Sequence, residues 1–595
     1  MNSLQRAFKT FSSVEDLRKI LNETWPIATK EVLTLLNTVI KNGLVIDGAG
    51  NPWFKADVGI FQGKIVEIGK LADKETEKIL DAKGLIVCPG FIDIHTHSDL
   101  SLLINARAES KVRQGVTTEV LGNCGMSAAP AKKDTLHLLK QEWEPEAEEV
   151  KWNWSTLGDY LGLVEKRGVA VNVASLVGNG TVRTAVLGVQ DKMPNTKEMA
   201  EMKALVAEAM RDGAFGMSSG LVYLPGCYSA TSELIELCKV VAVYGGIYTS
   251  HIRGERETIV DALKEAIEIA EKTGIPVQVS HNCPKYGGHG KFKQMVEIYE
   301  EARLRGVDAT LDNDAHTDLN PSLTQALPQW AQAGGAKKIV KRLRDAKTRG
   351  KIKKEMIEDK LPGPGYCGLV KHGRWDRIFL FQSKKNKSLI GKSLKEIAKL
   401  KKKDPFDAYF DLIVEDEGEA TGLFNYIDEE DIQTVLKHPL MMVSSDGSSL
   451  APYGSLGKIH GYSPCSYGEY PYILERYVRE EGILTLQEAI RKMTSFPAQK
   501  LGLRDRGLLR QGMWADVVIF DPETIKDRAT SRYPYHFPLA NYPHRYPEGI
   551  RYVLVNGEVV IEGDKHRGVL PGKVLRHKPL DLSSASERKS KHSSR

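Results

Sequence analysis

Eight short apolar segments that alternate with stretches of helical periodicity constrain the fold of this 595-residue chain more than any other feature. Apolar runs bounded by turn residues are typical of buried strands, and strands that alternate with helices favour βα units and a parallel sheet. Eight is the number of strands in a (β/α)8 barrel. We therefore predict an α/β fold with a TIM-type (β/α)8 barrel, whose strands lie at 86–94, 116–121, 170–177, 214–218, 246–250, 276–280, 307–311 and 440–444.

The stretch 195–213 shows how the intervening helices are recognised. Asn195 and Glu198 have the spacing of a capping box, and apolar residues then recur every three or four positions up to Gly213. A capping box, an amphipathic stripe and a terminal glycine together predict a helix over this stretch.

The two ends of the chain have a different pattern. Short alternating runs with glycine turns occupy 37–85 and return at 501–575, which predicts a small β-sandwich formed from both chain ends. The barrel then spans 86–500. More than 100 residues separate its last two strands, and this length predicts an insertion lobe at about 322–425 beside the barrel mouth. We expect a helical extension at 1–36 and a disordered basic tail at 576–595.

Composition excludes several classes of protein. Lys and Arg outnumber Asp and Glu by 83 to 77, and most of this excess lies in the last twenty residues, so no nucleic-acid partner is indicated. The seven cysteines are too few and too scattered for a disulfide framework, which favours a reducing compartment. We find neither a signal peptide nor a membrane span, and we expect a cytoplasmic protein with no membrane partner. The sequence does not indicate an oligomeric state.

Residues that bind metals follow five of the eight predicted strands. Strand ends on one rim are where barrels of this kind place their chemistry. His95 and His97 lie two apart and would point to the same face of their strand. A pair of this kind is a weak signal alone, but the whole set predicts a metal centre: His95, His97, Cys124, His251, His281 and Asp446.

Imidazole and thiolate ligands suit zinc, with cobalt, nickel or manganese as possible substitutes. Six ligands exceed the needs of one tetrahedral ion, so we expect a tight zinc site with a second, weaker site beside it. Zinc lowers the pKa of bound water to about 7. Asp446 would act as general acid and base, because it would take a proton from water and deliver it to the departing nitrogen. The predicted reaction is hydrolysis of a C–N bond.

Several stretches carry recognisable motifs, beginning with Pro-Gly-Phe-Ile-Asp-Ile-His-Thr-His at 89–97. The others lie at 114–118, 122–125, 220–226, 250–253, 327–330, 444–447 and 553–557. With these motifs the span 38–575 resembles the amidohydrolase superfamily, and specifically its D-aminoacylase branch, the N-acyl-D-amino-acid deacylases. Cys124 distinguishes this branch from hydantoinase-like relatives, which use a carboxylated lysine.

The resemblance implies a zinc-dependent barrel with a β-sandwich and a small-molecule N-acyl substrate. It also implies ligand roles, with Cys124, His251 and His281 at the tight zinc and His95 and His97 at the weaker one. Asp446 would be the acid and base.

The substrate pocket departs from the family pattern. Family members usually have a lysine two residues after the sixth-strand histidine, but the nearest lysine in this chain is Lys285. Asp314 and His316 stand where Tyr-Pro-Tyr is usual after the seventh strand. Ser-Pro-Cys at 463–465 replaces the usual His-Pro-Arg. The resemblance implies that the usual residues hold the substrate's α-carboxylate, so gaining Asp314 would change the pocket's charge preference. The candidate substrate-binding residues are Tyr223, Arg253, Lys285, Asp314 and His316.

The sequence leaves three functions open. The first is deacylation of a linear N-acyl-D-amino acid or a related N-acyl compound. The second is hydrolysis of a cyclic, hydantoin-like amide or a lactone with the same metals. The third is a catalytically silent binding protein, which the intact ligand set and Asp446 argue against.

Overall fold

The computed structural model describes residues 36–71, 74–143, 146–332, 334–358, 365–458, 464–529 and 545–578. The predicted helical extension at 1–36, apart from Leu36, and the predicted tail beyond residue 578 lie outside the described residues. Within the described part of the chain, no helix combines the length and apolarity needed to cross a lipid bilayer.

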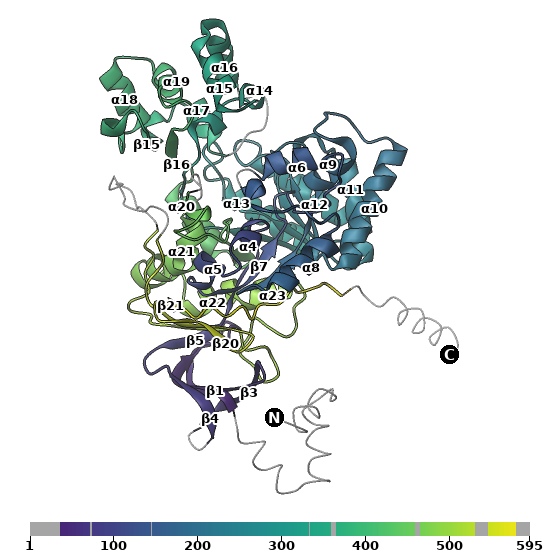
Figure 1. Ribbon diagram of the computed structural model, residues 1–595, viewed down its shortest axis with the longest axis vertical. Helices are drawn as coiled ribbons and strands as arrows, with labels where there is room; N and C mark the ends of the chain where they lie inside the picture. The colour runs from purple at the N-terminus through teal and green to yellow at the C-terminus, as the bar shows by residue number, and fades with distance from the viewer. Residues whose placement is uncertain are drawn as a thin grey trace.

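One nine-stranded sheet is built from both ends of the chain, and it lies at the bottom of Figure 1. Strand β5 connects the two contributions, because it pairs in parallel with β1 and antiparallel with β18. The N-terminal strands are β1 (Leu36–Val45), β2 (Phe54–Phe61), β3 (Lys64–Gly69), β4 (Thr76–Asp81) and β5 (Ile86–Pro89); the C-terminal strands are β18 (Val517–Phe520), β19 (Ile550–Val555), β20 (Glu558–Glu562) and β21 (Lys565–His566).

The prediction of one continuous strand at 86–94 is wrong. The chain forms β5 in the nine-stranded sheet and then β6 (Phe91–Asp93), which pairs with β7 in a different sheet. Gly90 lies between them, where a Cβ atom would be 2.2 Å from Oγ1 of Thr117. Only glycine allows this close approach, so the apolar run passes from one sheet into the next at this residue.

Every other predicted strand segment overlaps a strand of a parallel series, with bounds that differ by up to two residues at the carboxyl end. The series is β6, β7 (Val116–Leu121), β8 (Asn172–Ser175), β9 (Val177–Gly178), β10 (Gly216–Gly220), β11 (Ile247–His251), β12 (Val277–Val279), β13 (Ala309–Asn313) and β17 (Met441–Val443). A break at Leu176 separates β8 from β9, and their neighbours β7 and β10 continue the pairing on either side.

Backbone hydrogen bonds also join the first and last strands of this series. The amide of Asp446 donates to the carbonyl of His95 at 3.1 Å, and the amide of His97 donates to the carbonyl of Gly447 at 3.0 Å. These bonds bring the chain after β6 beside the chain after β17. Residues 350 positions apart in sequence therefore share one edge of the parallel strands.

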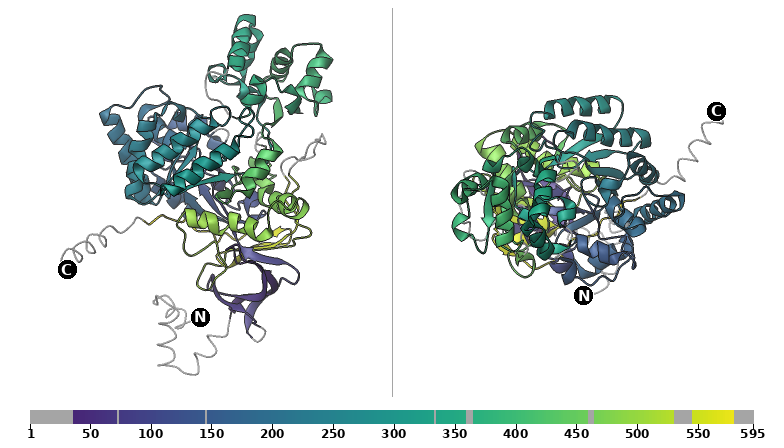
Figure 2. Two further views of the ribbon diagram at one scale, coloured as in Figure 1. Left: turned by 180° about the vertical axis from the view of Figure 1, so that it is seen from behind. Right: turned by 90° about the horizontal axis from the view of Figure 1, so that it is seen from above.

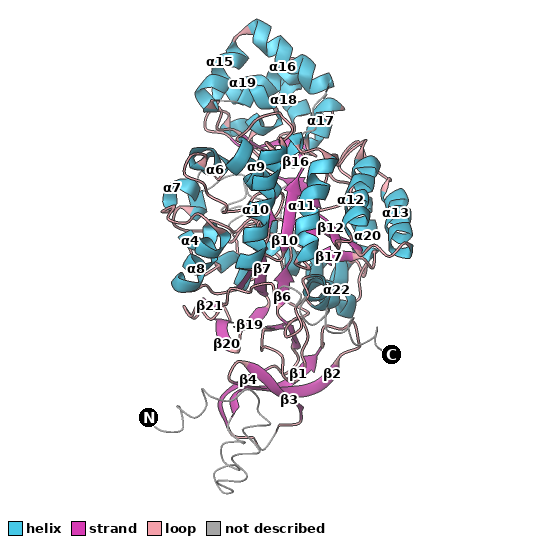
Figure 3. Cartoon of the chain, turned by 90° about the vertical axis from the view of Figure 1, so that its right-hand side faces the viewer, coloured by secondary structure: helices cyan, strands magenta, loops and turns pink. Residues whose placement is uncertain are grey.

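Helices surround the parallel strands, as Figure 3 shows. The prediction of a helix at 195–213 is confirmed by α10 (Thr196–Asp212), whose capping box uses Asn195 and Glu198 and whose C-cap is Gly213. The other main helices of this layer are α8 (Leu157–Arg167), α9 (Asn179–Leu187), α11 (Thr231–Val243), α12 (Ile259–Thr273), α13 (Phe292–Leu304), α20 (Glu429–Lys437), α21 (Cys465–Tyr472), α22 (Leu486–Met493) and α23 (Ser495–Lys500).

A lobe inserted between β13 and β17 lies at the end of the molecule opposite the nine-stranded sheet, as Figures 1 and 2 both show. It contains a three-stranded sheet of β14 (Asp318–Leu319), β15 (Ile378–Gln382) and β16 (Thr421–Asn425). Its helices are α14 (Gln329–Gln332), α15 (Gly335–Arg344), α16 (Ala346–Glu358), α17 (Cys367–Lys371), α18 (Leu394–Lys401) and α19 (Pro405–Glu415).

The lobe has its own hydrophobic core. Tyr409 and Phe410 of α19 are completely buried in a cluster that is separate from the core around the parallel strands. The lobe therefore has a core of its own, and Tyr426 packs against both this core and the core around the parallel strands.

We predict that Phe410→Ala destabilises the lobe alone by about 3–5 kcal/mol, the usual cost of removing a buried aromatic side chain. Hydrogen exchange measured by mass spectrometry should show lost protection in α15 to α19 and unchanged protection in β10 to β13. Leu400→Ala is a matched control, because Leu400 is 59% exposed on α18 and its loss should cost less than about 0.5 kcal/mol. Lost protection throughout the parallel strands would contradict the separation of the two cores.

Candidate metal centre and substrate pocket

The six predicted metal ligands meet at the carboxyl ends of the parallel strands. The Sγ atom of Cys124, which follows β7, lies close to three imidazole nitrogens: 3.2 Å from Nε2 of His95, 3.7 Å from Nδ1 of His251 and 3.6 Å from Nε2 of His281. An oxygen of Asp446 lies 3.3 Å from Nε2 of His95 and 3.0 Å from Nε2 of His97. Strands far apart in sequence thus place one thiol, four imidazoles and one carboxylate together.

Two carboxylates orient three of these imidazoles from behind. The Nδ1 atom of His95 lies 3.2 Å from Asp312, on β13. Glu255, four residues after His251, lies 3.1 Å from Nδ1 of His281 and 3.5 Å from Nε2 of His251. Each of the three imidazoles therefore turns one ring nitrogen towards the Cys124 thiol and the other towards a carboxylate, which is the arrangement that fixes metal-binding histidines in proteins.

Three of the candidate ligands have left-handed backbone conformations. The φ angles are 51° at Cys124, 33° at His281 and 47° at Asp446. This region is uncommon for residues other than glycine, and such residues gather at functional sites where surrounding structure holds them. The tight turn after each strand aims the side chain inward across the strand ends.

The thiol and the carboxylate of this cluster both favour their charged forms. Burial opposes ionisation of Cys124, but the charge of His95 and hydrogen bonds from His251 and His281 hold the pKa of the thiol well below its ordinary value. Burial also opposes ionisation of Asp446, but the charges of His95 and His281 hold the pKa of this carboxyl well below its usual range. The site therefore offers a thiolate and a carboxylate together.

A completely buried ion pair supports the turn that carries Asp446. The Nζ atom of Lys111 lies 2.8 Å from Asp93, on β6, and 2.5 Å from the hydroxyl of Ser445. Asp93 also accepts a hydrogen bond of 3.0 Å from the amide of Ser445. These bonds hold the residue directly before Asp446, whose carboxylate contacts His95 and His97.

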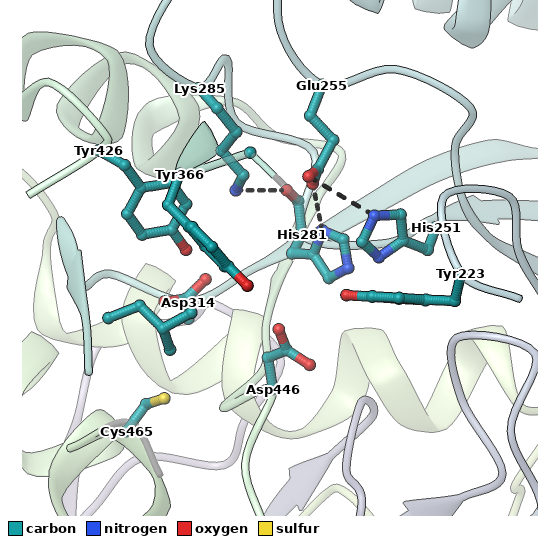
Figure 4. A pocket seen from close by; sticks show the side chains of 12 residues that line it. Tyr223, His251, Glu255, His281, Lys285, Asp314, Tyr366, Tyr426, Asp446 and Cys465 are labelled. Atoms are coloured by element: carbon teal, nitrogen blue, oxygen red, sulfur yellow. Dashed lines mark hydrogen bonds and ion pairs between the residues drawn. The ribbon is translucent and has the colours of Figure 1, made fainter. Parts of the chain in front are cut away.

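A small cavity of about 70 Å³ opens beside the cluster, and Figure 4 shows its lining. Three predicted substrate-binding residues, Tyr223, Lys285 and Asp314, line it. The inserted lobe between β13 and β17 contributes four of the other lining residues. The remaining lining residues are His251, Glu255, His281, Leu319, Gly365, Tyr366, Tyr426, Asp446 and Cys465.

Two predicted substrate-binding residues do not line this cavity. Arg253 donates two hydrogen bonds to the carboxylate of Glu265, at 3.0 and 2.9 Å, so its guanidinium is already paired. His316 is completely buried, lies 2.6 Å from Glu469 and stacks on Tyr472. Burial lowers the pKa of His316 but the Glu469 charge raises it to about 9. We therefore leave Arg253 and His316 out of the pocket.

The donor set fits a metal ion well. Imidazole nitrogens and a thiolate are the ligands that zinc prefers, and the carboxylates behind them complete the usual arrangement. The donor atoms of His95, Cys124, His281 and Asp446 all lie within 4.8 Å of one another, as do those of His251, Glu255 and His281. The site can therefore bind zinc with ligands from opposite strands.

The Amidohydrolase family model matches residues 78–347 and 385–561, which is most of the chain and includes every residue of this cluster. The chain belongs to the amidohydrolase family.

Curated relatives match this amidohydrolase over almost their whole length. An N-acyl-D-glutamate deacylase from Alcaligenes xylosoxydans xylosoxydans is 34% identical over 91% of this chain and 96% of its own. A D-aminoacylase from the same organism is 32% identical over 90% of this chain and 97% of its own.

A solved structure of a deacylase is also similar to this chain over most of its length. It is an N-acyl-D-glutamate deacylase from Bordetella bronchiseptica in complex with zinc and a phosphonate inhibitor that mimics the tetrahedral intermediate of its reaction. That structure is 31% identical, has a TM-score of 0.70 and covers 91% of this chain and 99% of its own. The chain is thus a metal-dependent amidohydrolase, and it is an enzyme.

Sequence reasoning missed Glu255 and Asp312 in this amidohydrolase. Asp312 is a charged residue inside a buried strand, and an acidic residue at such a position needs a partner, so this signal was present. Glu255 lies in a loop after β11, where no periodicity distinguishes it from other polar residues. Its role depends on how the loop folds back over the histidines.

We predict that Lys111→Met destabilises the protein by about 3–5 kcal/mol, because it leaves Asp93 charged and buried without its cation. Urea unfolding of this variant should be compared with the Asp93→Asn/Lys111→Met double variant, which should recover much of the loss. Lys272→Met, which breaks an exposed ion pair with Glu268, should cost less than about 1 kcal/mol. A Lys111→Met protein as stable as the parent would contradict the prediction.

Proposed function

We propose that this chain is a zinc-dependent amidohydrolase that removes the acyl group from an N-acyl-D-amino acid. The observation that carries the proposal is the convergence of one thiolate, three carboxylate-backed imidazoles and Asp446 beside a cavity that also contains Lys285. The parallel series of eight strand positions, joined at its ends by backbone hydrogen bonds, supports a (β/α)8 barrel as the framework, with the nine-stranded sheet as the β-sandwich part.

Cys124, His251 and His281 would hold a tight zinc ion, and His95 and His97 a weaker one, with Asp446 beside both. A binuclear metal centre is named for a D-aminoacylase structure that is 30% identical to this chain, with a TM-score of 0.71 and coverage of 91% of this chain and all of its own. Zinc, when bound, would make hydroxide available at neutral pH.

Asp446 is the proposed general base and acid. Its carboxylate lies at the cavity, and in its charged form it can accept a proton from a water molecule bound there. The protonated carboxyl can then donate to the nitrogen that leaves when the amide bond breaks. The bonds that Ser445 makes with Asp93 and Lys111 hold the backbone directly before Asp446.

Lys285 is the proposed partner of the substrate's α-carboxylate. Burial disfavours its charged form, but the charge of Glu255 raises the pKa of this lysine above its ordinary value. Its ammonium is thus a buried cation that lines the cavity, 3.1 Å from the carbonyl oxygen of His281. A carboxylate bound there would place the neighbouring amide near the metal ligands.

A matched substrate panel on zinc-loaded protein tests the proposal. We expect turnover of N-acetyl-D-amino acids and little turnover of the L-isomers, of acyl amines without a carboxylate, or of cyclic amides. Turnover confined to hydantoins, dihydropyrimidines or lactones would replace the proposal with a cyclic-substrate hydrolase that uses the same ligands.

We predict that Asp446→Asn lowers kcat/KM at least about 100-fold, which is the usual contribution of a general acid or base. The asparagine retains the shape of the side chain but cannot accept the proton. Zinc content, measured by mass spectrometry of the metal, should show that the tight site remains filled. An Asp446→Asn enzyme with parental activity would contradict the assigned role.

We predict that Asp312→Asn weakens zinc binding about 10- to 100-fold, the usual effect of removing a carboxylate that orients a metal-binding histidine. Asp312 contacts His95 and the amide of His281, so the effect should appear as a higher zinc concentration for half-maximal activity. Excess zinc should restore most of the turnover. Loss of activity that zinc does not restore would show a role other than positioning.

A further inference from the structure

The carboxylate of Asp314 stands out among the charged groups of the cavity. Asp314 follows β13, its side chain lines the cavity, and the residue is only 7% exposed. Within the described part of the chain, no hydrogen bond or ion pair is made by its carboxylate oxygens. A buried carboxylate without a partner is costly, so this group is suited to a ligand that brings a positive charge or several hydrogen-bond donors.

Lys285 is the lysine that lines the same cavity as Asp314. The two groups form no ion pair in the structure, and the Lys285 ammonium instead contacts the carbonyl of His281 and lies 5.5 Å from the ring centroid of Tyr426. Burial raises the pKa of Asp314, and the Lys285 charge opposes this rise. The cavity therefore offers a cationic position at Lys285 and an anionic position at Asp314, in addition to the carboxylates of Glu255 and Asp446 beside the histidines.

Two tyrosines complete the wall beside these charges. Tyr366 and Tyr426 line the cavity, and their rings meet edge to face with centroids 6.3 Å apart. Figure 4 shows both side chains on the same side of the cavity as Asp314. Aromatic faces bind cations favourably, and an aromatic wall also packs against the methylene groups of a long side chain.

We propose that the substrate is an N-acyl amino acid with a cationic side chain, such as an Nα-acyl derivative of lysine or ornithine. This inference rests on the proposed function. Lys285 binds the α-carboxylate, and Asp314 binds the side-chain ammonium between Tyr366 and Tyr426. The substrate's carboxylate thus pairs with the ammonium of Lys285, and its side-chain ammonium pairs with the carboxylate of Asp314.

The same geometry disfavours acidic side chains. A second carboxylate on the substrate would approach Asp314 in a buried site, where like charges repel strongly and water does not screen them. The described lining residues include no arginine and no lysine other than Lys285. If Lys285 binds the α-carboxylate, no second lysine or arginine among these lining residues can bind another carboxylate of the substrate.

A different occupant of this position is a metal ion, because the donor atoms of Asp314, His316 and Cys465 also lie within 4.8 Å of one another. His316 is already held by Glu469, and Asp314 faces the cavity. We favour the ammonium group, since Asp314 lies on the wall that a substrate contacts. The zinc content of the Asp314→Asn variant distinguishes a bound metal ion from a bound ammonium group.

The test compares side chains of similar length and different charge on zinc-loaded enzyme. Nα-acetyl-D-lysine should exceed Nα-acetyl-D-norleucine in kcat/KM by about 10- to 100-fold, the effect of one hydrogen-bonded charge pair. Nα-acetyl-D-glutamate should be poorer than Nα-acetyl-D-glutamine. Binding of the products D-lysine and D-norleucine, measured by calorimetry, should show the same preference without turnover.

Asp314→Asn should remove the preference for lysine, so that kcat/KM for the lysine derivative falls about 10- to 100-fold relative to kcat/KM for the norleucine derivative, because the charged contact is lost. Asp318→Asn is the matched control, since Asp318 is equally buried nearby but does not line the cavity. This control should keep the parental preference.

Three results would overturn the inference: equal turnover of the lysine and norleucine derivatives by the parent, an equal loss for all substrates in Asp314→Asn, or a lower zinc content in that variant. The last would identify Asp314 as a metal ligand. If no member of the N-acetyl-amino-acid series is hydrolysed, the proposed function itself fails, whereas turnover of neutral members without a lysine preference removes only this inference.

Discussion

The contact between the Cys124 thiolate and three buried imidazoles is the interaction on which the site depends. A thiolate and several ionisable rings at the same buried point are unfavourable unless their charges and hydrogen bonds balance. Glu255 and Asp312 supply that balance from the outer side of the rings. The result is a cluster in which each imidazole has one nitrogen fixed and the other directed at the thiol.

The fold provides this cluster through short turns after parallel strands. Cys124, His281 and Asp446 each have a positive φ angle two or three residues after a strand, so the chain turns there while the side chain points across the strand ends. The backbone cost of these conformations, of order 1–3 kcal/mol each, must be met by surrounding contacts. The Lys111–Asp93 pair is one such contact, and the nine-stranded sheet holds the opposite end of β6 through Gly90.

Sequence patterns were sufficient for much of this architecture and for the residues that the fold gathers into the candidate metal site. Buried strands are continuous apolar runs, and a residue placed directly after such a run must lie at the strand end, so His251 and Asp446 were predictable. Arg253 was predicted as a pocket residue, but it pairs with Glu265 and does not line the cavity, and sequence does not show that pairing. The split of the 86–94 segment between two sheets depends on the contact of Gly90 with Thr117, which is a property of the folded chain.

The proposed chemistry requires that Cys124 bind zinc, and X-ray absorption at the zinc edge detects a sulfur ligand of the metal. With one equivalent of zinc bound, we predict a sulfur scatterer at about 2.3 Å together with nitrogen or oxygen scatterers at about 2.0–2.1 Å. Cys124→Ser should lose the sulfur contribution, while Cys465→Ser should keep it. A spectrum of the parent protein with only nitrogen and oxygen neighbours would exclude Cys124 as a zinc ligand.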